Sequence, residues 1–253
     1  MLTPSDGQMK AMKYVVVVGT YNEAENIPGI LPEILRQGPE YEAIVVDDNS
    51  PDGTGRLVAE MAAKQPRIHV IHRPARMGYG SAYLEGFRAA LDLGADYIVQ
   101  MDADYSHNPG DIPRLVEAAK DADIAVGSRY IKGGSTEGWP FRRRLISRGG
   151  NMVAHFLLAL PIRDCTGGFK CFPRATLESL NFSEIRSRGF ASLYEINHAC
   201  HRSGKSFREV PINFVERRTG QSKMTWRMIV EALVVMLRLR LRGGRSRKAL
   251  RAR

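Results

Sequence analysis

The first 130 residues alternate short apolar runs with longer segments of helical periodicity. Each apolar run is rich in β-branched residues and too short for a buried helix, so we expect buried strands over residues 14–18, 43–46, 68–71, 97–101 and 124–126. The segments between these runs have the spacing of helices that pack on a sheet, and they cover residues 24–36, 55–64, 81–93 and 112–120. This alternation predicts an α/β fold with a mostly parallel sheet and helices on both faces.

The second half of the chain has a less regular pattern. Residues 128–150 are rich in glycine and arginine and are expected to form a loop, with helices over 151–160 and 192–203 and a strand over 207–215. Residues 224–241 predict a helix with a broad apolar face, made of Trp226, Ile229, Val230, Leu233, Val234 and Leu237. Its uncharged part falls far short of the ~20 residues that span a bilayer, so we expect no transmembrane helix. The polar residues 243–253 are expected to be disordered.

Positive charge is concentrated at the C-terminal end of the 253-residue chain. The formal net charge is +10, and residues 217–253 alone carry +11, from twelve lysines and arginines and one acid, Glu231. The rest of the chain is nearly neutral, so this segment indicates binding to an anionic partner such as phospholipid or nucleic acid. Three cysteines without a CxxC pair argue against a disulfide framework and a zinc ribbon, so we expect a reducing compartment. The first thirteen residues contain no long apolar run, so no signal peptide is expected.

Acidic residues follow two of the predicted strands. Asp47 and Asp48 close the second strand, and Asp102 and Asp104 close the fourth. Parallel strands bring their carboxyl ends to one edge of a sheet, where such carboxylates repel one another unless a cation or hydrogen-bond donors neutralise them. Mg²⁺ typically binds one or two carboxylates together with substrate phosphates. One such cluster would be explained by polar loops alone, but two at strand ends favour a binding site.

Several motifs, in order along the chain, carry a resemblance to a known family. Residues 19–23 read GTYNE, residues 45–54 read VVDDNSPDGT and residues 101–107 read MDADYSH, followed by GSRY at 127–130, DCTGGF at 164–169 and EVPI at 209–212. The series resembles the dolichol-phosphate and polyprenol-monophosphate mannose synthases of the type without transmembrane helices, which are inverting GT-A glycosyltransferases. The chain departs from the family pattern at Gly19, where proline is usual, and at Ser106, where some relatives have glutamine.

The resemblance implies a donor site with a metal ion. Mg²⁺ or Mn²⁺ would lie on the donor diphosphate, held by Asp104 together with Ser106. GDP-mannose would be contacted by Gly19, Tyr21, Glu23, Val46, Asp48, Asp102, Ala103, Asp104 and Arg129.

The resemblance also implies a site for the acceptor phosphate. Its residues would be Arg129, Arg143, Ser147, Arg217 and Lys223, and those expected to take part in catalysis are Asp102, Asp104 and Arg217. This assignment agrees with residue chemistry, because arginine matches phosphate oxygens with a planar fork and lysine supplies a point charge.

The implied reaction transfers mannose from GDP-mannose to a polyprenyl or dolichyl phosphate. A phosphomonoester has a second pKa of ~6 and can attack as an anion, so no general base is assigned. Direct displacement would give polyprenyl-phosphate β-mannose. Two alternatives remain open: a UDP-glucose polyprenyl-phosphate glucosyltransferase, and a non-catalytic binder of an anionic surface or nucleic acid. Nucleic acid is not expected as a partner, because Trp226 is the only aromatic residue after Phe214 that could stack on bases.

We therefore expect two parts in the chain. Residues 10–222 would form the GT-A glycosyltransferase domain, and residues 223–253 an amphipathic helix with a basic tail. The helix is expected to lie in a membrane interface with its arginines over anionic headgroups, which places the protein peripherally on the cytoplasmic face. A separate membrane-anchoring subunit is a further partner considered. The alternative is that the apolar face packs on the domain and only the last dozen residues are free.

Overall fold

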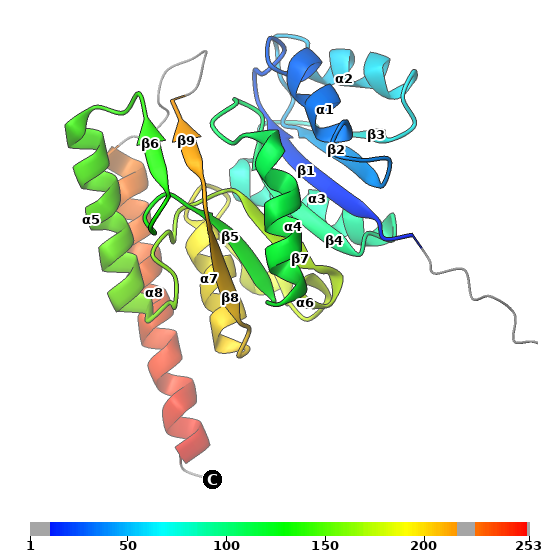
Figure 1. Ribbon diagram of the computed structural model, residues 1–253. Helices are drawn as coiled ribbons and strands as arrows, with labels where there is room; N and C mark the ends of the chain where they lie inside the picture. The colour runs from blue at the N-terminus through cyan, green and yellow to red at the C-terminus, as the bar shows by residue number, and fades with distance from the viewer. Residues whose placement is uncertain (1–10, 217–225, 252–253) are drawn as a thin grey trace, which may run out of the picture.

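The structure is a computed structural model that describes residues 11–216 and 226–251, without the side chains of residues 226, 227 and 242–251. Within these residues seven strands form the central sheet, in the order β3-β2-β1-β4-β7-β5-β8 (Figure 1). Every neighbouring pair is parallel except the pairs of β7, which is antiparallel to β4 and β5. The strands are β1 (Tyr14–Thr20), β2 (Tyr41–Asp47), β3 (Ile68–His72), β4 (Tyr97–Asp102), β5 (Ile124–Ser128), β7 (Lys170–Pro173) and β8 (Phe207–Pro211).

Helices cover both faces of this sheet, which explains why β1 reads as an unbroken apolar run. Val15 and Val17 pack on one face, under α3 (Tyr79–Asp92), α5 (Phe141–Leu158), α6 (Arg174–Glu178), α7 (Ser192–Arg202) and α8 (Trp226–Arg251). Val16 and Val18 pack on the other face, under α1 (Ile27–Leu35), α2 (Thr54–Ala62) and α4 (Ile112–Lys120). Two short 3₁₀ turns, Pro109–Asp111 and Phe182–Glu184, complete the connections. The predicted α/β fold with helices on both faces is confirmed.

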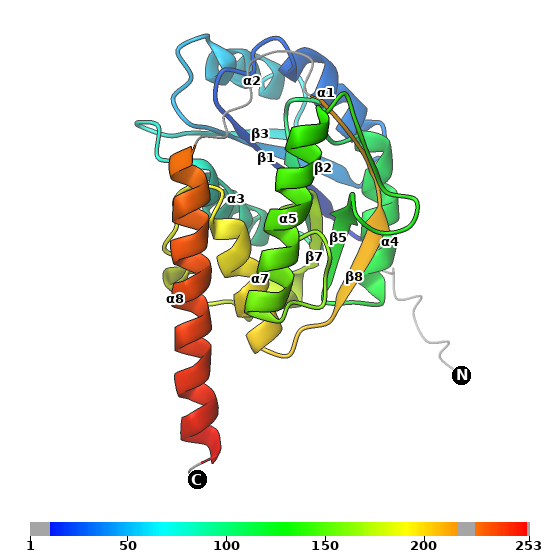
Figure 2. The same ribbon diagram turned by 90° about the vertical axis from the view of Figure 1, so that its left-hand side faces the viewer.

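The structure corrects the expectation of a loop over residues 128–150, because part of this segment forms a strand and a helix. β6 (Ser135–Glu137) pairs with β9 (Asn213–Val215) in a small parallel sheet, and α5 begins at Phe141 directly after Pro140. Gly149 and Gly150 lower the intrinsic helix propensity of this segment, which is why its composition favoured a loop. Tertiary packing outweighs that cost, because α5 buries Ala154 and Leu158 in the core and lies against α8 (Figure 2).

The C-terminal helix both packs on the domain and exposes apolar side chains. Val235, Met236 and Leu239 are buried in the core beside α5 and α7, so the alternative of a packed helix is confirmed for this face. The face predicted from sequence is instead largely exposed, at Val230, Leu233, Val234 and Leu237. The helix continues to Arg251, so the disorder expected over residues 243–253 is wrong for residues 243–251, and the last two residues lie outside the described part of the chain. No helix in the described part of the chain is long and apolar enough to cross a membrane.

We predict that Gly86→Ala lowers the free energy of unfolding by about 1–3 kcal/mol, because a Cβ at this position of α3 would lie 2.3 Å from Cγ1 of Val17. Urea denaturation measures the loss. Gly149→Ala is the matched control, since a Cβ there meets no heavy atom within 4 Å and alanine favours the α5 helix. Equal destabilisation by the two variants would contradict this packing of α3 on β1.

Candidate active site

The two acidic segments meet at the carboxyl edge of the sheet. In the registers of β1, Thr20 lies opposite Asp47 of β2, and Gly19 lies opposite Asp102 of β4. The ends of these three strands are neighbours in the sheet order. The prediction that both acidic clusters converge on one edge is therefore confirmed, and this is the edge where open α/β sheets bind ligands.

The SPDGT segment after β2 is bound to the segment after β1. The side chain of Asp52 accepts hydrogen bonds from the backbone N–H groups of Ala24 and Thr54, each at 3.0 Å. The backbone N–H of Glu23 donates in turn to Oγ1 of Thr54, also at 3.0 Å. Burial raises the pKa of Asp52, but the hydrogen bonds from Thr54 and Ala24 outweigh burial and lower it below the ordinary value. Gly53, with φ +86°, makes the turn that brings these groups together.

Asp48 anchors the turn that precedes α3. Its Oδ1 accepts hydrogen bonds from Nη1 of Arg73 at 2.6 Å and from the backbone N–H of Met77 at 2.9 Å, and its Oδ2 accepts from the N–H of Gly78 at 2.8 Å. Both residues of the ion pair are almost fully buried. Asp48 therefore fixes the backbone of this turn at the side of the site. A nucleotide that contacted the Asp48 carboxylate would have to share oxygens that already accept hydrogen bonds from three donors.

The other donor-side residues differ in accessibility. Val46 is completely buried, so its side chain supports the strand end and offers no surface to a ligand. Tyr21 is partly exposed, and the guanidinium of Arg76 lies over its ring at 4.1 Å from the centroid. Glu23 is also partly exposed and accepts a hydrogen bond from Nδ2 of Asn26 at 2.8 Å. An aromatic ring under a guanidinium is a surface on which a nucleotide base can stack.

Asp102 is held by two tyrosines of α3. The hydroxyl groups of Tyr79 and Tyr83 lie 3.2 and 3.0 Å from the same oxygen, Oδ1. The pKa of Asp102 is raised, with burial as the largest cause and the negative charge of Asp104 as a further one. Both tyrosines have pKa values raised well above 10 by burial and by Asp102, so their hydroxyl groups stay protonated as donors.

The donor atoms around Asp104 fit a hard divalent cation. Ala103 is buried between the two aspartates, and Oδ1 of Asp104 accepts a hydrogen bond from the backbone N–H of Ser106 at 3.1 Å. The hydroxyl oxygen of Ser106 is buried and has no hydrogen-bond partner among the described residues. No group of three or more His, Cys, Asp or Glu side chains in that part of the chain is placed to hold a metal unaided. One or two carboxylates completed by substrate phosphates is the arrangement typical of Mg²⁺.

Arg129, at the end of β5, is committed to a buried ion pair. Its Nε and Nη2 donate to the two oxygens of Asp164, both at 2.7 Å, and Nη2 also donates to Oγ1 of Thr166 at 2.7 Å. Burial alone would raise the pKa of Asp164, but the charge and hydrogen bonds of Arg129 outweigh burial and lower it. This pair fixes the loop before β7, and a phosphate contact from Arg129 would have to come chiefly from Nη1.

The remaining phosphate-site residues lie on α5 or beyond the described residues. The guanidinium of Arg143 lies 4.1 Å from the ring centroid of Trp139 and pairs with Glu216, and Oγ of Ser147 lies 2.6 Å from the hydroxyl of Tyr130. α5 therefore presents both residues beside aromatic rings on the β5 side of the sheet. Arg217 and Lys223, expected to bind phosphate, lie outside the described residues.

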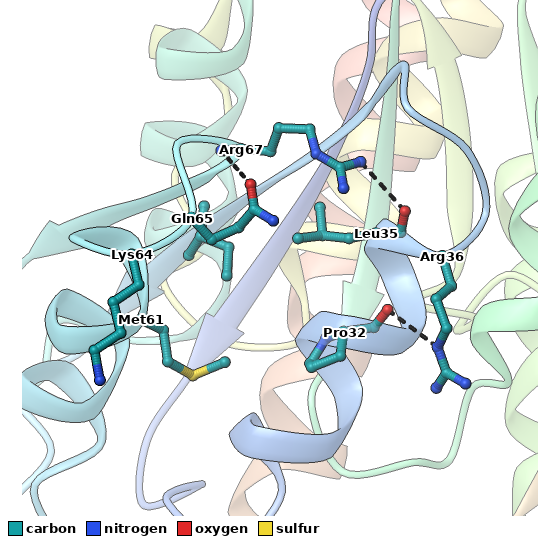
Figure 3. A pocket seen from close by; sticks show the side chains of 8 residues that line it. Pro32, Leu35, Arg36, Met61, Lys64, Gln65 and Arg67 are labelled. Carbon is teal, nitrogen blue, oxygen red and sulfur yellow. Dashed lines mark hydrogen bonds between the residues drawn. The ribbon is translucent and has the colours of Figure 1, made fainter.

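Sequence reasoning assigned no role to Asp164, Trp139 or Tyr130. Asp164 lies in the DCTGGF motif, so the signal was present, but its partner lies 35 residues earlier. Tyr130 ends the GSRY motif, but the roles of Tyr130 and Trp139 depend on contacts with distant segments of the chain. A separate hollow of about 400 Å³ lies between the ends of α1 and α2, lined by Pro32, Leu35, Arg36, Met61, Lys64, Gln65, Arg67 and Ile68 (Figure 3). It is at the start of β3, away from the acidic edge.

Comparison with known proteins identifies a family and several relatives. Residues 15–180 match the family described as Glycosyl transferase family 2. The chain is 40% identical over 243 residues to the undecaprenyl-phosphate mannosyltransferase of Micrococcus luteus, covering 94% of this chain and all of that protein. It is 41% identical over 235 residues to the polyprenol monophosphomannose synthase of Mycolicibacterium smegmatis, covering 92% of this chain and 89% of that protein. The dolichol-phosphate mannosyltransferase of Pyrococcus furiosus is 41% identical over 237 residues, with 90% and 64% covered.

The fold is also similar to solved structures. Glucosyl-3-phosphoglycerate synthase from Mycobacterium tuberculosis, in complex with Mn²⁺, UDP-glucose and phosphoglyceric acid, superposes with a TM-score of 0.68 at 17% identity, covering 91% of this chain and 80% of that one. This similarity supports the GT-A fold. At such low identity it carries no information on the substrate of this chain.

We predict that Asp164→Asn lowers the free energy of unfolding at pH 7 by about 3–5 kcal/mol, because it leaves the buried Arg129 without its counter-charge. The pKa of Asp164 is lower in the folded chain, so its contribution is present above the unfolded value of ~3.9 and disappears as pH falls below it. The difference between wild type and variant should therefore shrink on acidification, as urea denaturation at several pH values would show.

The exposed pair of Asp121 and Arg208 offers the control for that variant. Asp121→Asn should change the free energy of unfolding by less than about 1 kcal/mol at any pH. A similar loss of unfolding free energy in both variants would show that the buried ion pair contributes no more to stability than the exposed one.

Proposed function

The chain belongs to glycosyltransferase family 2, and from this we propose that it transfers mannose from GDP-mannose to a polyprenyl phosphate with inversion. The observation that carries the proposal is 40–41% identity, over at least 90% of the chain, to three proteins named for transfer of mannose to polyprenyl phosphates. The geometry supports it, because one edge of the sheet brings together groups suited to a nucleotide, a cation and phosphates.

The donor would lie over the carboxyl ends of β1, β2 and β4. Tyr21 under Arg76 would support the base, and Asp102, oriented by its tyrosines, would face the ribose or the sugar. Asp104 with Ser106 would hold Mg²⁺ or Mn²⁺ on the diphosphate, where a divalent cation offsets the charge that develops on the leaving group. The carboxylate of Asp48 then contributes indirectly, by fixing the turn between β3 and α3.

The acceptor would approach from the β5 and α5 side. Its phosphate is already ionised near neutral pH, so its oxygen can attack the anomeric carbon without a protein base. Arg143 and Ser147 of α5, with Arg129, Arg217 and Lys223, would orient the anion and offset its repulsion by the donor diphosphate. Attack opposite the leaving diphosphate would invert the anomeric centre.

UDP-glucose is the second donor considered. Its support is the motif series, because lipid-phosphate glucose synthases share much of it, whereas the solved glucosyl-3-phosphoglycerate synthase, at 17% identity, bears on the fold alone. The mannosyl relatives are more than twice as similar in sequence, and they match the chain almost end to end. A non-catalytic binding protein is disfavoured because the carboxylates of the edge are all present.

The acceptor implies contact with a lipid surface, and α5 and α8 offer one. Large apolar side chains are exposed on both helices: Phe141, Leu145, Ile146, Met152, Val153 and Phe156 on α5, and Val230, Leu233, Val234, Leu237 and Leu241 on α8. The helices lie on the same side of the domain (Figure 2), and we call this set the α5–α8 apolar face. Arg142, Arg144, Arg148, Arg238 and Arg240 are exposed on the same helices, and α5 contains no acidic residue.

An apolar face with cationic residues along it matches the interface of an anionic bilayer. We therefore propose that this face contacts phospholipid, with the enzyme a peripheral protein on the cytoplasmic face of a membrane. A membrane-anchoring subunit could cover the same face, and failure of the isolated chain to bind vesicles would favour that partner.

We predict that Asp104→Ala abolishes nearly all transfer to polyprenyl phosphate while the protein stays folded, because the cation loses a carboxylate ligand. Activity should also disappear on chelation and return with Mg²⁺ or Mn²⁺. The matched control is Glu117→Ala, which removes an exposed carboxylate of α4. A rate above about a tenth of wild type would contradict the assignment, since that loss corresponds to only about 1.4 kcal/mol.

We predict that the double variant Val234→Glu, Leu237→Glu weakens binding to anionic vesicles at least about tenfold, because two apolar side chains would no longer enter the interface. Flotation with phosphatidylglycerol vesicles at physiological salt measures binding. Activity on a short, water-soluble acceptor should remain. Substitution tests the face better than truncation after Leu237, which would also remove the buried Leu239.

Met12→Glu is the control for that experiment, since Met12 is exposed but precedes β1, outside the α5–α8 apolar face. It should bind vesicles as wild type does. Undiminished vesicle binding by the double variant would overturn the assignment of this face to phospholipid.

A further inference from the structure

Tyr79 lies where the donor and acceptor sides of the proposed site meet. It is the first residue of α3 and follows Gly78, whose N–H is bound by Asp48. Its ring stacks on Phe190 with centroids 4.3 Å apart and an interplanar angle of 26°. Two segments far apart in sequence, at Asp48 and Phe190, therefore determine where the Tyr79 side chain lies.

The hydrogen bonds of the Tyr79 hydroxyl have a defined direction. Nε2 of Gln100 lies 3.1 Å from the phenolic oxygen and can only donate to it. The phenolic proton is then available to Oδ1 of Asp102, 3.2 Å away. The pair Gln100–Tyr79 thus turns one oxygen of Asp102 toward α3. The other carboxylate oxygen, Oδ2, can then face the proposed donor.

The same hydroxyl lies against the loop that carries the partner of Arg129. A Cβ added to Gly168 would lie 2.5 Å from the Tyr79 hydroxyl oxygen, and the oxygens of Asp102 would be 3.5 Å from it. Gly168 belongs to the loop in which Asp164 and Thr166 bind Arg129. The loop can approach Asp102 this closely only because residue 168 has no side chain.

Tyr83 provides a comparison within the same helix. Its hydroxyl lies 2.8 Å from the carbonyl oxygen of Met101 and 3.0 Å from Oδ1 of Asp102. The three heavy atoms nearest to a Cβ at Gly168 belong to Tyr79 and Asp102, and none of the three belongs to Tyr83. Both tyrosines therefore contact the carboxylate, but the Tyr79 hydroxyl is the atom nearest to a Cβ at Gly168.

We propose that Tyr79 is a positioning residue for sugar transfer, whose hydroxyl sets both the carboxylate of Asp102 and the distance of the Gly168 loop from it. The inference rests on the proposed function, in which Asp102 faces the donor and Arg129 the acceptor. A displacement of Asp102 or of Arg129 would lower the rate of the chemical step more than it lowers ground-state binding of the donor.

Steady-state kinetics of Tyr79→Phe test the first part of the proposal. The variant keeps the ring and its stacking on Phe190 and loses only the hydroxyl. We expect kcat to fall about tenfold, the range for a lost hydrogen bond to a charged group, with the KM for the donor within about twofold. An unchanged kcat, or a loss confined to KM, would overturn the positioning role.

A double-mutant cycle with Gly168→Ala tests the second part. Gly168→Ala alone should be strongly impaired, because its methyl group collides with the Tyr79 hydroxyl. Tyr79→Phe combined with Gly168→Ala should recover to the activity of Tyr79→Phe alone, since the colliding atom is gone. Tyr83→Phe combined with Gly168→Ala should show no recovery. Additive effects in the Tyr79 cycle, or equal recovery in the Tyr83 cycle, would overturn the contact.

The melting temperatures of the same variants separate this inference from the proposed function. Relief of the collision should raise the melting temperature of the Tyr79→Phe, Gly168→Ala protein above that of Gly168→Ala, whatever the substrate. A wild-type protein without transfer activity would contradict the proposed function, while this thermal cycle would still test the contact. Active wild type with an additive cycle would contradict the positioning role alone.

Discussion

Repulsion among carboxylates gathered at one sheet edge is the constraint on which the rest of the site depends. The strand register brings the acidic segments after β2 and β4 to either side of β1, and burial makes each uncompensated charge costly. In the structure, three of these carboxylates each have a different partner. Asp48 is paired with Arg73, Asp164 with Arg129, and two phenolic hydroxyl groups lie within hydrogen-bond distance of Asp102.

Asp104 is the carboxylate of this edge to which we assign a cation. Next to it lies the buried hydroxyl oxygen of Ser106, and a nucleotide diphosphate would supply further oxygens. In the proposed function this division of charge also orients the lipid acceptor. α5 carries Arg143 and Ser147 beside the site and Leu145 on the exposed apolar face, so one helix serves both the phosphate and the bilayer.

The parts of the fold that follow from local pattern were predictable from sequence. The β-branched runs predicted the first five strands of the central sheet, and the acids after two of them located the candidate site. A helix was expected over residues 151–160, but the part of α5 before residue 151 could not be predicted, because Gly149 and Gly150 oppose a helix that its packing stabilises. The buried face of α8 could not be predicted either, because α8 is apolar over much of its circumference. Contact with α5 and α7 determines that Val235 and Leu239 are the residues buried. Pairs such as Arg129 with Asp164 depend on chain segments that meet only in the folded protein.

The donor is the central claim, and an assay of the purified protein with labelled GDP-mannose or UDP-glucose, a polyprenyl phosphate and Mg²⁺ or Mn²⁺ tests it most directly. Label should pass from GDP-mannose into a lipid-soluble product, with little or none from UDP-glucose. Preferential transfer from UDP-glucose, or no lipid product from either donor, would contradict the account.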